Sequence, residues 1–70
     1  RLIISPNPTS NLVTITGGNG QPIALYNILG ELIHTELPTA TDHCQLNLSQ
    51  QPTGIYFVKV GSVTKKIIKH

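Results

Sequence analysis

Turn-forming residues interrupt this chain at short intervals along its whole length. Clusters rich in Gly, Pro, Asn and Ser separate the apolar runs, and the apolar residues recur with a period of two, not 3.6. This pattern predicts strands at 2–5, 12–16, 23–27, 31–37, 43–48, 54–60 and 62–69. The predicted fold class is all-β, a seven-stranded antiparallel immunoglobulin-like β-sandwich that is somewhat smaller than usual.

Alternation within the segments predicts which faces are buried. Val13 and Ile15 alternate with Leu12, Thr14 and Thr16, and Cys44, Leu46 and Leu48 alternate with Gln45 and Asn47. Each set places its apolar members on one face of a half-buried strand, with Cys44 as a buried, inert thiol. Segment 55–58 is apolar on both faces. It fits a central strand covered on both sides, which we favour, or a strand that lies against a partner.

Three connections are expected to have a defined form. Gly30 should adopt a positive φ in a turn-plus-bulge hairpin that joins 24–26 to 32–34. The short break at Gly61 and Ser62 predicts a closing hairpin between the last two strands. Residues 17–20 are glycine-rich, but neither a lysine nor a helix start follows them. They are therefore interpreted as a hairpin loop and not as a phosphate-binding loop.

Length and composition limit the classes of function. With 70 residues, 39% of them hydrophobic and 11% charged, the chain is predicted to be one small globular domain, 1–70. Because it has no initial Met and enters a strand at once, we expect it to be the C-terminal module of a larger protein. Its net charge of +2 comes from a C-terminal cluster without arginine–aromatic interleaving, so no nucleic-acid partner is expected. No apolar run approaches the ~20 residues that cross a bilayer, so no membrane insertion is expected.

Residues that could carry chemistry are few and scattered. Cys44 is the only cysteine, so neither an intramolecular disulfide nor a CxxC site is expected. The histidines lie on different predicted elements without metal-ligand spacing, and the acids are too few for a convincing carboxylate pair. These residues are His34, His43 and His70, with Glu31, Glu36 and Asp42. We expect no catalytic residue, no metal and no cofactor, and so no enzyme.

Five short motifs, spread over almost the whole chain, resemble a known family. They are PNP at 6–8, LYNILGE at 25–31, LNLS at 46–49, TGIYFVKV at 53–60 and KKIIK at 65–69. Each motif alone is weak. In this order and at these separations they resemble the C-terminal sorting domain, type A, of the type IX secretion system (Por secretion system).

The resemblance implies a role in export. Proteins of this family, in Bacteroidetes, cross the inner membrane with a signal peptide, fold in the periplasm, and cross the outer membrane because the machinery recognises this domain. A sortase-like protease then commonly removes the domain, and the cargo stays on the cell surface or is released. By this similarity the chain directs an N-terminal cargo in cis, and its partners are the type IX secretion machinery and the protease.

The family's motifs carry over to three sets of residues in this chain. They are Pro6, Asn7 and Pro8; Gly54 and Tyr56; and Lys65, Lys66, Ile67, Ile68 and Lys69. The two prolines stiffen the exit from the first strand, which either shapes a turn or serves recognition. Gly54 should allow a close backbone approach or an unusual dihedral angle. Tyr56 should bury its ring and bond its hydroxyl, which favours a structural role for this pair.

Two explanations stay open for the basic last strand. If alternate residues of 63–69 share a face, neither face is cleanly apolar, and lysines at a sheet edge discourage aggregation. Alternatively, this edge pairs with a secretion component through backbone hydrogen bonds and an acidic counterpart. Exposed edges also make a homodimer conceivable.

Two rival functions come from other classes. A carbohydrate-binding β-sandwich on an extracellular enzyme or adhesin needs exposed aromatic rings, whereas Tyr26, Tyr56 and Phe57 all lie in predicted core strands. A structural immunoglobulin-like spacer also fits the strand pattern. A spacer predicts that deletion of 65–70 affects stability but not destination, and a sorting domain predicts the opposite emphasis.

Overall fold

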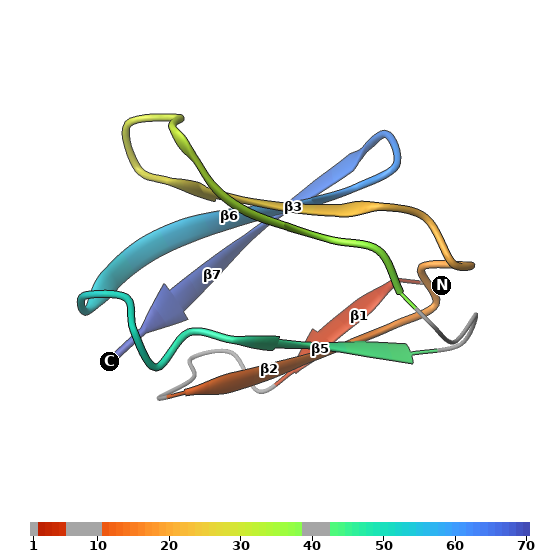
Figure 1. Ribbon diagram of the computed structural model, residues 1–70, viewed down its shortest axis with the longest axis horizontal. Helices are drawn as coiled ribbons and strands as arrows, with labels where there is room; N and C mark the ends of the chain where they lie inside the picture. The colour runs from red at the N-terminus through yellow and green to blue at the C-terminus, as the bar shows by residue number, and fades with distance from the viewer. Residues whose placement is uncertain (1, 6–10, 39–42) are drawn as a thin grey trace.

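All seven predicted strands are present in the computed structural model, which describes residues 2–5, 11–38 and 43–70. They are β1 (Ile3–Ser5), β2 (Leu12–Thr16), β3 (Ile23–Asn27), β4 (Leu32–Glu36), β5 (His43–Asn47), β6 (Gly54–Val60) and β7 (Val63–Lys69) (Figure 1). Each observed end lies within one residue of its predicted position. The all-β prediction is confirmed. The described residues include no helix that is long and apolar enough to span a membrane.

The strands form two antiparallel sheets. One sheet has three strands in the order β1-β2-β5, and the other has four in the order β4-β3-β6-β7. Figure 1 shows the two sheets as separate layers, with β2 and β5 below β3 and β6. This arrangement makes β4 and β7 the two edge strands of the larger sheet.

A hydrophobic core lies between the sheets. Its buried members alternate along the strands, as side chains that point to one face of a sheet must. They are Val13, Ile15, Ile23, Leu25, Leu46, Leu48, Tyr56, Val58, Val60 and Ile67. The faces predicted for 12–16 and for Leu46 and Leu48 are therefore confirmed, but Cys44 is only half-buried at the margin of this core. A fully buried thiol was the wrong expectation, because β5 is an edge strand.

The central strand β6 is covered on one face only. Tyr56, Val58 and Val60 point into the core, while Ile55 and Phe57 are half-buried on the opposite face. We call that side of the four-stranded sheet its outer face. The prediction that β6 is covered on both faces is wrong, because a fold of two layers covers only the inner face of each sheet.

Two predicted hairpins have different outcomes. Gly61 and Ser62 alone separate β6 from β7, and Val60 pairs with Val63 across the turn, so the closing hairpin is confirmed. Residues 17–20 connect β2 to β3, which belong to different sheets. They are therefore a crossing between the layers, and the hairpin-loop interpretation is wrong.

Candidate functional site

The basic motif of the sequence lies on β7, which pairs with β6 along its whole length. Ile67 is opposite Tyr56 and is fully buried. It anchors the strand in the core, and its side chain is inaccessible to a partner in the folded protein. By the pairing register, Lys65 and Lys69 share the face of Ile67, while Lys66 and Ile68 share the other face, as alternation predicts.

Lys69 has a partner within the chain. Its Nζ donates a hydrogen bond of 2.7 Å to the carbonyl oxygen of Gln51. Since Lys69 pairs with Gly54 at the start of β6, its side chain reaches the loop that precedes this strand. The contact ties the end of β7 to the connection between β5 and β6.

Lys65, Lys66 and Ile68 are the exposed members of the motif, and we call them the β7 surface. Lys65 projects from the inner face of this edge strand, and Lys66 and Ile68 project from its outer face. Both lysine side chains are exposed, and Ile68 is 41% exposed. Neither β6 nor β7 contains an acidic residue, and β6 adds the exposed Lys59. The surface is therefore basic with an apolar component, which suits an acidic counterpart.

Gly54 and Tyr56 build the corner between β5 and β6. Gly54 has a φ of +156°, and a Cβ atom there would meet nothing within 4 Å. The glycine therefore serves a backbone angle that side chains disfavour and not a close approach. The ring of Tyr56 is buried and its hydroxyl donates to the carbonyl oxygen of Pro52, as expected for a buried tyrosine.

The loop of residues 48–53 thus supplies two neighbouring acceptors. Gln51 binds Lys69 and Pro52 binds Tyr56, so two motifs far apart in sequence meet at adjacent carbonyl groups. The amide of Gln51 closes the loop by donating to the carbonyl oxygen of Leu48 at 2.9 Å. No sequence signal marks Gln51 or Pro52, because every residue has a backbone carbonyl.

Asn27 organises the hairpin between β3 and β4. Its Oδ1 accepts hydrogen bonds from the amides of Leu29 at 2.9 Å and Glu31 at 3.0 Å, and its Nδ2 donates to Glu31 Oε1 at 2.8 Å. Gly30 has a φ of 85°, and the register of the two strands shifts at a bulge, so the predicted turn-plus-bulge hairpin is confirmed. An asparagine just before a turn is a recognised turn former, and this signal could have identified Asn27 from the sequence.

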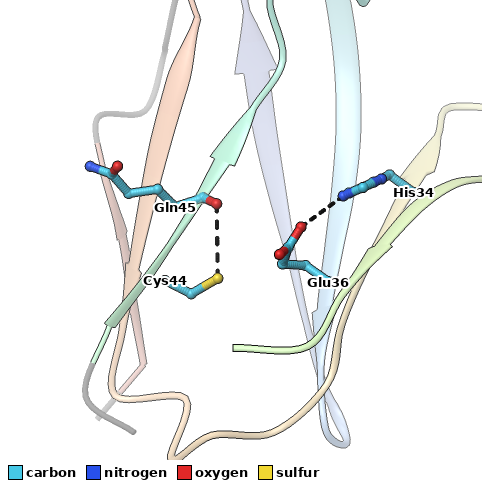
Figure 2. A network of polar contacts seen from close by, with 4 residues as sticks. All are labelled: His34, Glu36, Cys44 and Gln45. Carbon is cyan, nitrogen blue, oxygen red and sulfur yellow. Dashed lines mark hydrogen bonds and ion pairs between the residues drawn. The ribbon is translucent and has the colours of Figure 1, made fainter. Parts of the chain in front are cut away.

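A separate polar cluster lies between the edge strands β4 and β5 (Figure 2). His34 Nε2 and Glu36 Oε1 are 2.9 Å apart, and Cys44 Sγ donates to the carbonyl oxygen of Gln45 at 3.8 Å. Burial, and then the Glu36 carboxylate, raise the pKa of the Cys44 thiol, and a backbone hydrogen bond at Gln45 partly offsets the rise. The thiol is therefore protonated at neutral pH and is a weak nucleophile.

The remaining site predictions are of two kinds. Pro6, Asn7 and Pro8 lie outside the described residues. Within residues 2–5, 11–38 and 43–70, no group of three or more His, Cys, Asp or Glu side chains is placed to hold a metal ion.

The chain matches the model of one family over nearly its whole length. This family is described as "Secretion system C-terminal sorting domain", and the match covers residues 4–70. The interval includes the corner at Gly54 and Tyr56, the hairpin at Asn27 and the whole of β7. No curated protein matches the chain.

Proposed function

Because the chain belongs to the family of type IX secretion system C-terminal sorting domains, we propose that it is the sorting signal that directs an attached cargo protein to export. A sorting domain of this kind interacts with the secretion machinery, and its cargo is exported to the cell surface or the extracellular space. Such a signal is not an enzyme in itself. We propose further that the cargo passes through the periplasm and that a sortase-like protease then removes the domain.

The observation that carries this proposal is the display of Lys65, Lys66 and Ile68 on a strand that is fixed in place. The burial of Ile67 and the bond from Lys69 to Gln51 hold β7 against the rest of the fold. Side chains displayed on an ordered strand lose little conformational freedom when a partner binds. The β7 surface is thus suited to an acidic, partly apolar site on a secretion component.

We also propose that the two sheets form an immunoglobulin-like sandwich. The orders β1-β2-β5 and β4-β3-β6-β7 correspond to strands A-B-E and C′-C-F-G of that fold. Tyr56, near the start of β6, bonds back to Pro52, four residues earlier, as in the tyrosine corner of immunoglobulin-like domains. The core shared by both sheets supports the treatment of residues 1–70 as one domain.

A sugar-binding function is less well supported. Contrary to expectation, Tyr26 and Phe57 lie opposite each other on the outer face and not in the core. However, Leu32 and Ile55 are their neighbours, whereas a specific small-molecule site combines rings with precisely placed hydrogen-bonding groups. A spacer function, for its part, gives no role to the β7 surface.

Export of a fused reporter tests the proposed function. The full chain is placed behind a periplasmic reporter in a bacterium with a working type IX system, and a second fusion lacks residues 65–70. The full fusion should appear outside the cell and the shortened one should stay in the periplasm. Retention of both fusions contradicts the proposal, and export of both shows that the chain directs export without residues 65–70. The mass of the exported reporter shows whether a protease has removed the domain.

A further inference from the structure

The tip of the β3–β4 hairpin displays two large aliphatic side chains. Ile28 is 63% exposed and Leu29 is 80% exposed, and neither belongs to the hydrophobic core. Turns are usually built from small or polar residues, so the fold itself does not call for this pair. The hydrogen bonds of Asn27 to Leu29 and Glu31 hold the tip in one conformation.

The apolar surface continues from the tip onto the outer face. Leu32 is 57% exposed and lies opposite Tyr26, which in turn lies opposite the half-buried Phe57. We call Ile28, Leu29, Leu32, Tyr26 and Phe57 the hairpin surface. Single exposed apolar residues are ordinary, but a continuous group of them marks an interaction site.

The charges on this face indicate which kind of partner it fits. Lys59 lies opposite Ala24 and Lys66 opposite Phe57, so two basic residues share the outer face. None of the described residues that the register places on this face is acidic, and Glu31, in the turn itself, accepts the hydrogen bond from Asn27 Nδ2. A second copy of the chain would bring lysines against lysines, whereas a surface bordered by carboxylates would complement them.

We propose that the hairpin surface is a second docking site for the secretion machinery, an inference that rests on the proposed export function. The partner is a protein with an apolar pocket that receives Ile28 and Leu29 and with carboxylates opposite Lys59. The tip residues Ile28 and Leu29 lie on the connection between β3 and β4 and not on the edge strand β7, while Phe57 lies opposite Lys66, so the hairpin surface adjoins the β7 surface at that pair. Contact at two sites on one rigid domain raises affinity and specificity above those of either site alone.

A double substitution at the tip tests the inference in the reporter fusion. Ile28→Ser with Leu29→Ser should lower export about tenfold or more, because central apolar anchors carry much of the binding energy at protein interfaces. The thermal midpoint of the purified variant should stay close to that of the unsubstituted chain, since neither residue is in the core. The matched control is Leu37→Ser. Leu37 is 71% exposed and follows the opposite end of β4, and its substitution should leave export unchanged.

The charge requirement has its own pair of variants. Lys59→Glu should lower export more than Lys59→Gln, because reversal places two negative groups together and neutralisation only removes an attraction. If both charge variants are exported as well as the unsubstituted chain, the prediction that the partner places carboxylates opposite Lys59 is overturned.

A photo-crosslinking residue at position 29 identifies the occupant of the site. A crosslink to a secretion component, at a segment that contains apolar and acidic residues, supports the inference. A crosslink to a second copy of the fusion overturns it. The inference is also overturned if the tip residues Ile28 and Leu29 support export by binding a lipid vesicle or a polysaccharide and not a protein.

The outcomes separate this inference from the function on which it rests. If the unsubstituted fusion is retained in the periplasm, the export function fails and the inference fails with it. If the unsubstituted fusion and the tip variant are exported alike, the export function stands and only the second docking site is overturned.

Discussion

The ammonium group of Lys69 donates a hydrogen bond to the carbonyl oxygen of Gln51, which lies 18 residues earlier in the chain. This bond joins the end of β7 to the loop before β6. It separates the basic residues of the last strand by role, because Lys69 is held within the fold while Lys65 and Lys66 are exposed. Stability and export should therefore respond to different lysines.

Lys69→Met should destabilise the domain. The substitution keeps most of the aliphatic stem and removes the donor to Gln51, so the free energy of unfolding should fall by about 1 kcal/mol. Urea unfolding measures the loss. The matched control is Lys65→Met at an exposed position, which should change stability by less than about 0.5 kcal/mol. Equal effects of the two variants would show that the bond to Gln51 contributes nothing.

Tyr56→Phe should destabilise the corner between β5 and β6. The variant keeps the buried ring but leaves the Pro52 carbonyl without its donor, which should cost about 1 kcal/mol in unfolding free energy. The control is Tyr26→Phe on the half-buried outer face, where a smaller change is expected. Urea unfolding of both variants decides the matter. A Tyr56→Phe variant as stable as the parent chain would show that the Tyr56 hydroxyl does not stabilise the domain.

Gly30→Ala should strain the β3–β4 hairpin through its backbone alone. A Cβ atom at this position meets nothing within 4 Å, but the φ of +85° disfavours an L-residue. The expected loss in unfolding free energy is about 1 kcal/mol. Chemical synthesis with D-alanine at position 30 is the control, because a D-residue prefers positive φ. The D-alanine chain should be at least as stable as the parent, and a loss equal to that of L-alanine contradicts the backbone explanation.

Alkylation of Cys44 should depend on Glu36. The carboxylate is the second cause of the raised thiol pKa, after burial, so Glu36→Gln should lower that pKa and raise the thiolate fraction at pH 8. Because both side chains are partly exposed, the alkylation rate should rise by only about two- to threefold. Iodoacetamide labelling followed by mass spectrometry measures the rate. Glu31→Gln, at the residue that precedes β4, is the control and should leave the rate unchanged.

The strand boundaries could be predicted closely because turn-forming residues surround every apolar run. The partition of strands between sheets could not. The connection at 17–20 has the local composition of a hairpin loop, and only the pairing of β2 with β5 and of β3 with β6 makes it a crossing. Similarly, segment 55–58 is apolar on both faces, and local sequence does not tell whether a second layer covers the outer one.

The residue types of the candidate site could be predicted from the sequence, but which of these residues are buried, bonded within the fold or exposed could not. Alternation separates Ile67 from Ile68, yet the full burial of Ile67 depends on its place opposite Tyr56 in the register. The partner of Lys69 is a backbone carbonyl, which leaves no trace in residue identity. The exposed pair Ile28 and Leu29 was missed because aliphatic residues suggest a core until the turn around Asn27 is seen.

Export of a reporter fused to the Lys65→Glu, Lys66→Glu variant, measured beside its thermal midpoint, tests whether the machinery recognises the β7 surface. We expect a midpoint within about 4 °C of the parent, since both side chains are exposed. Export should fall about tenfold or more because the acidic partner is repelled. Lys69→Met should show the reverse, a lower midpoint with export kept at temperatures where the domain is folded. A folded double variant that is exported as well as the parent would contradict the claim that the machinery recognises the β7 surface.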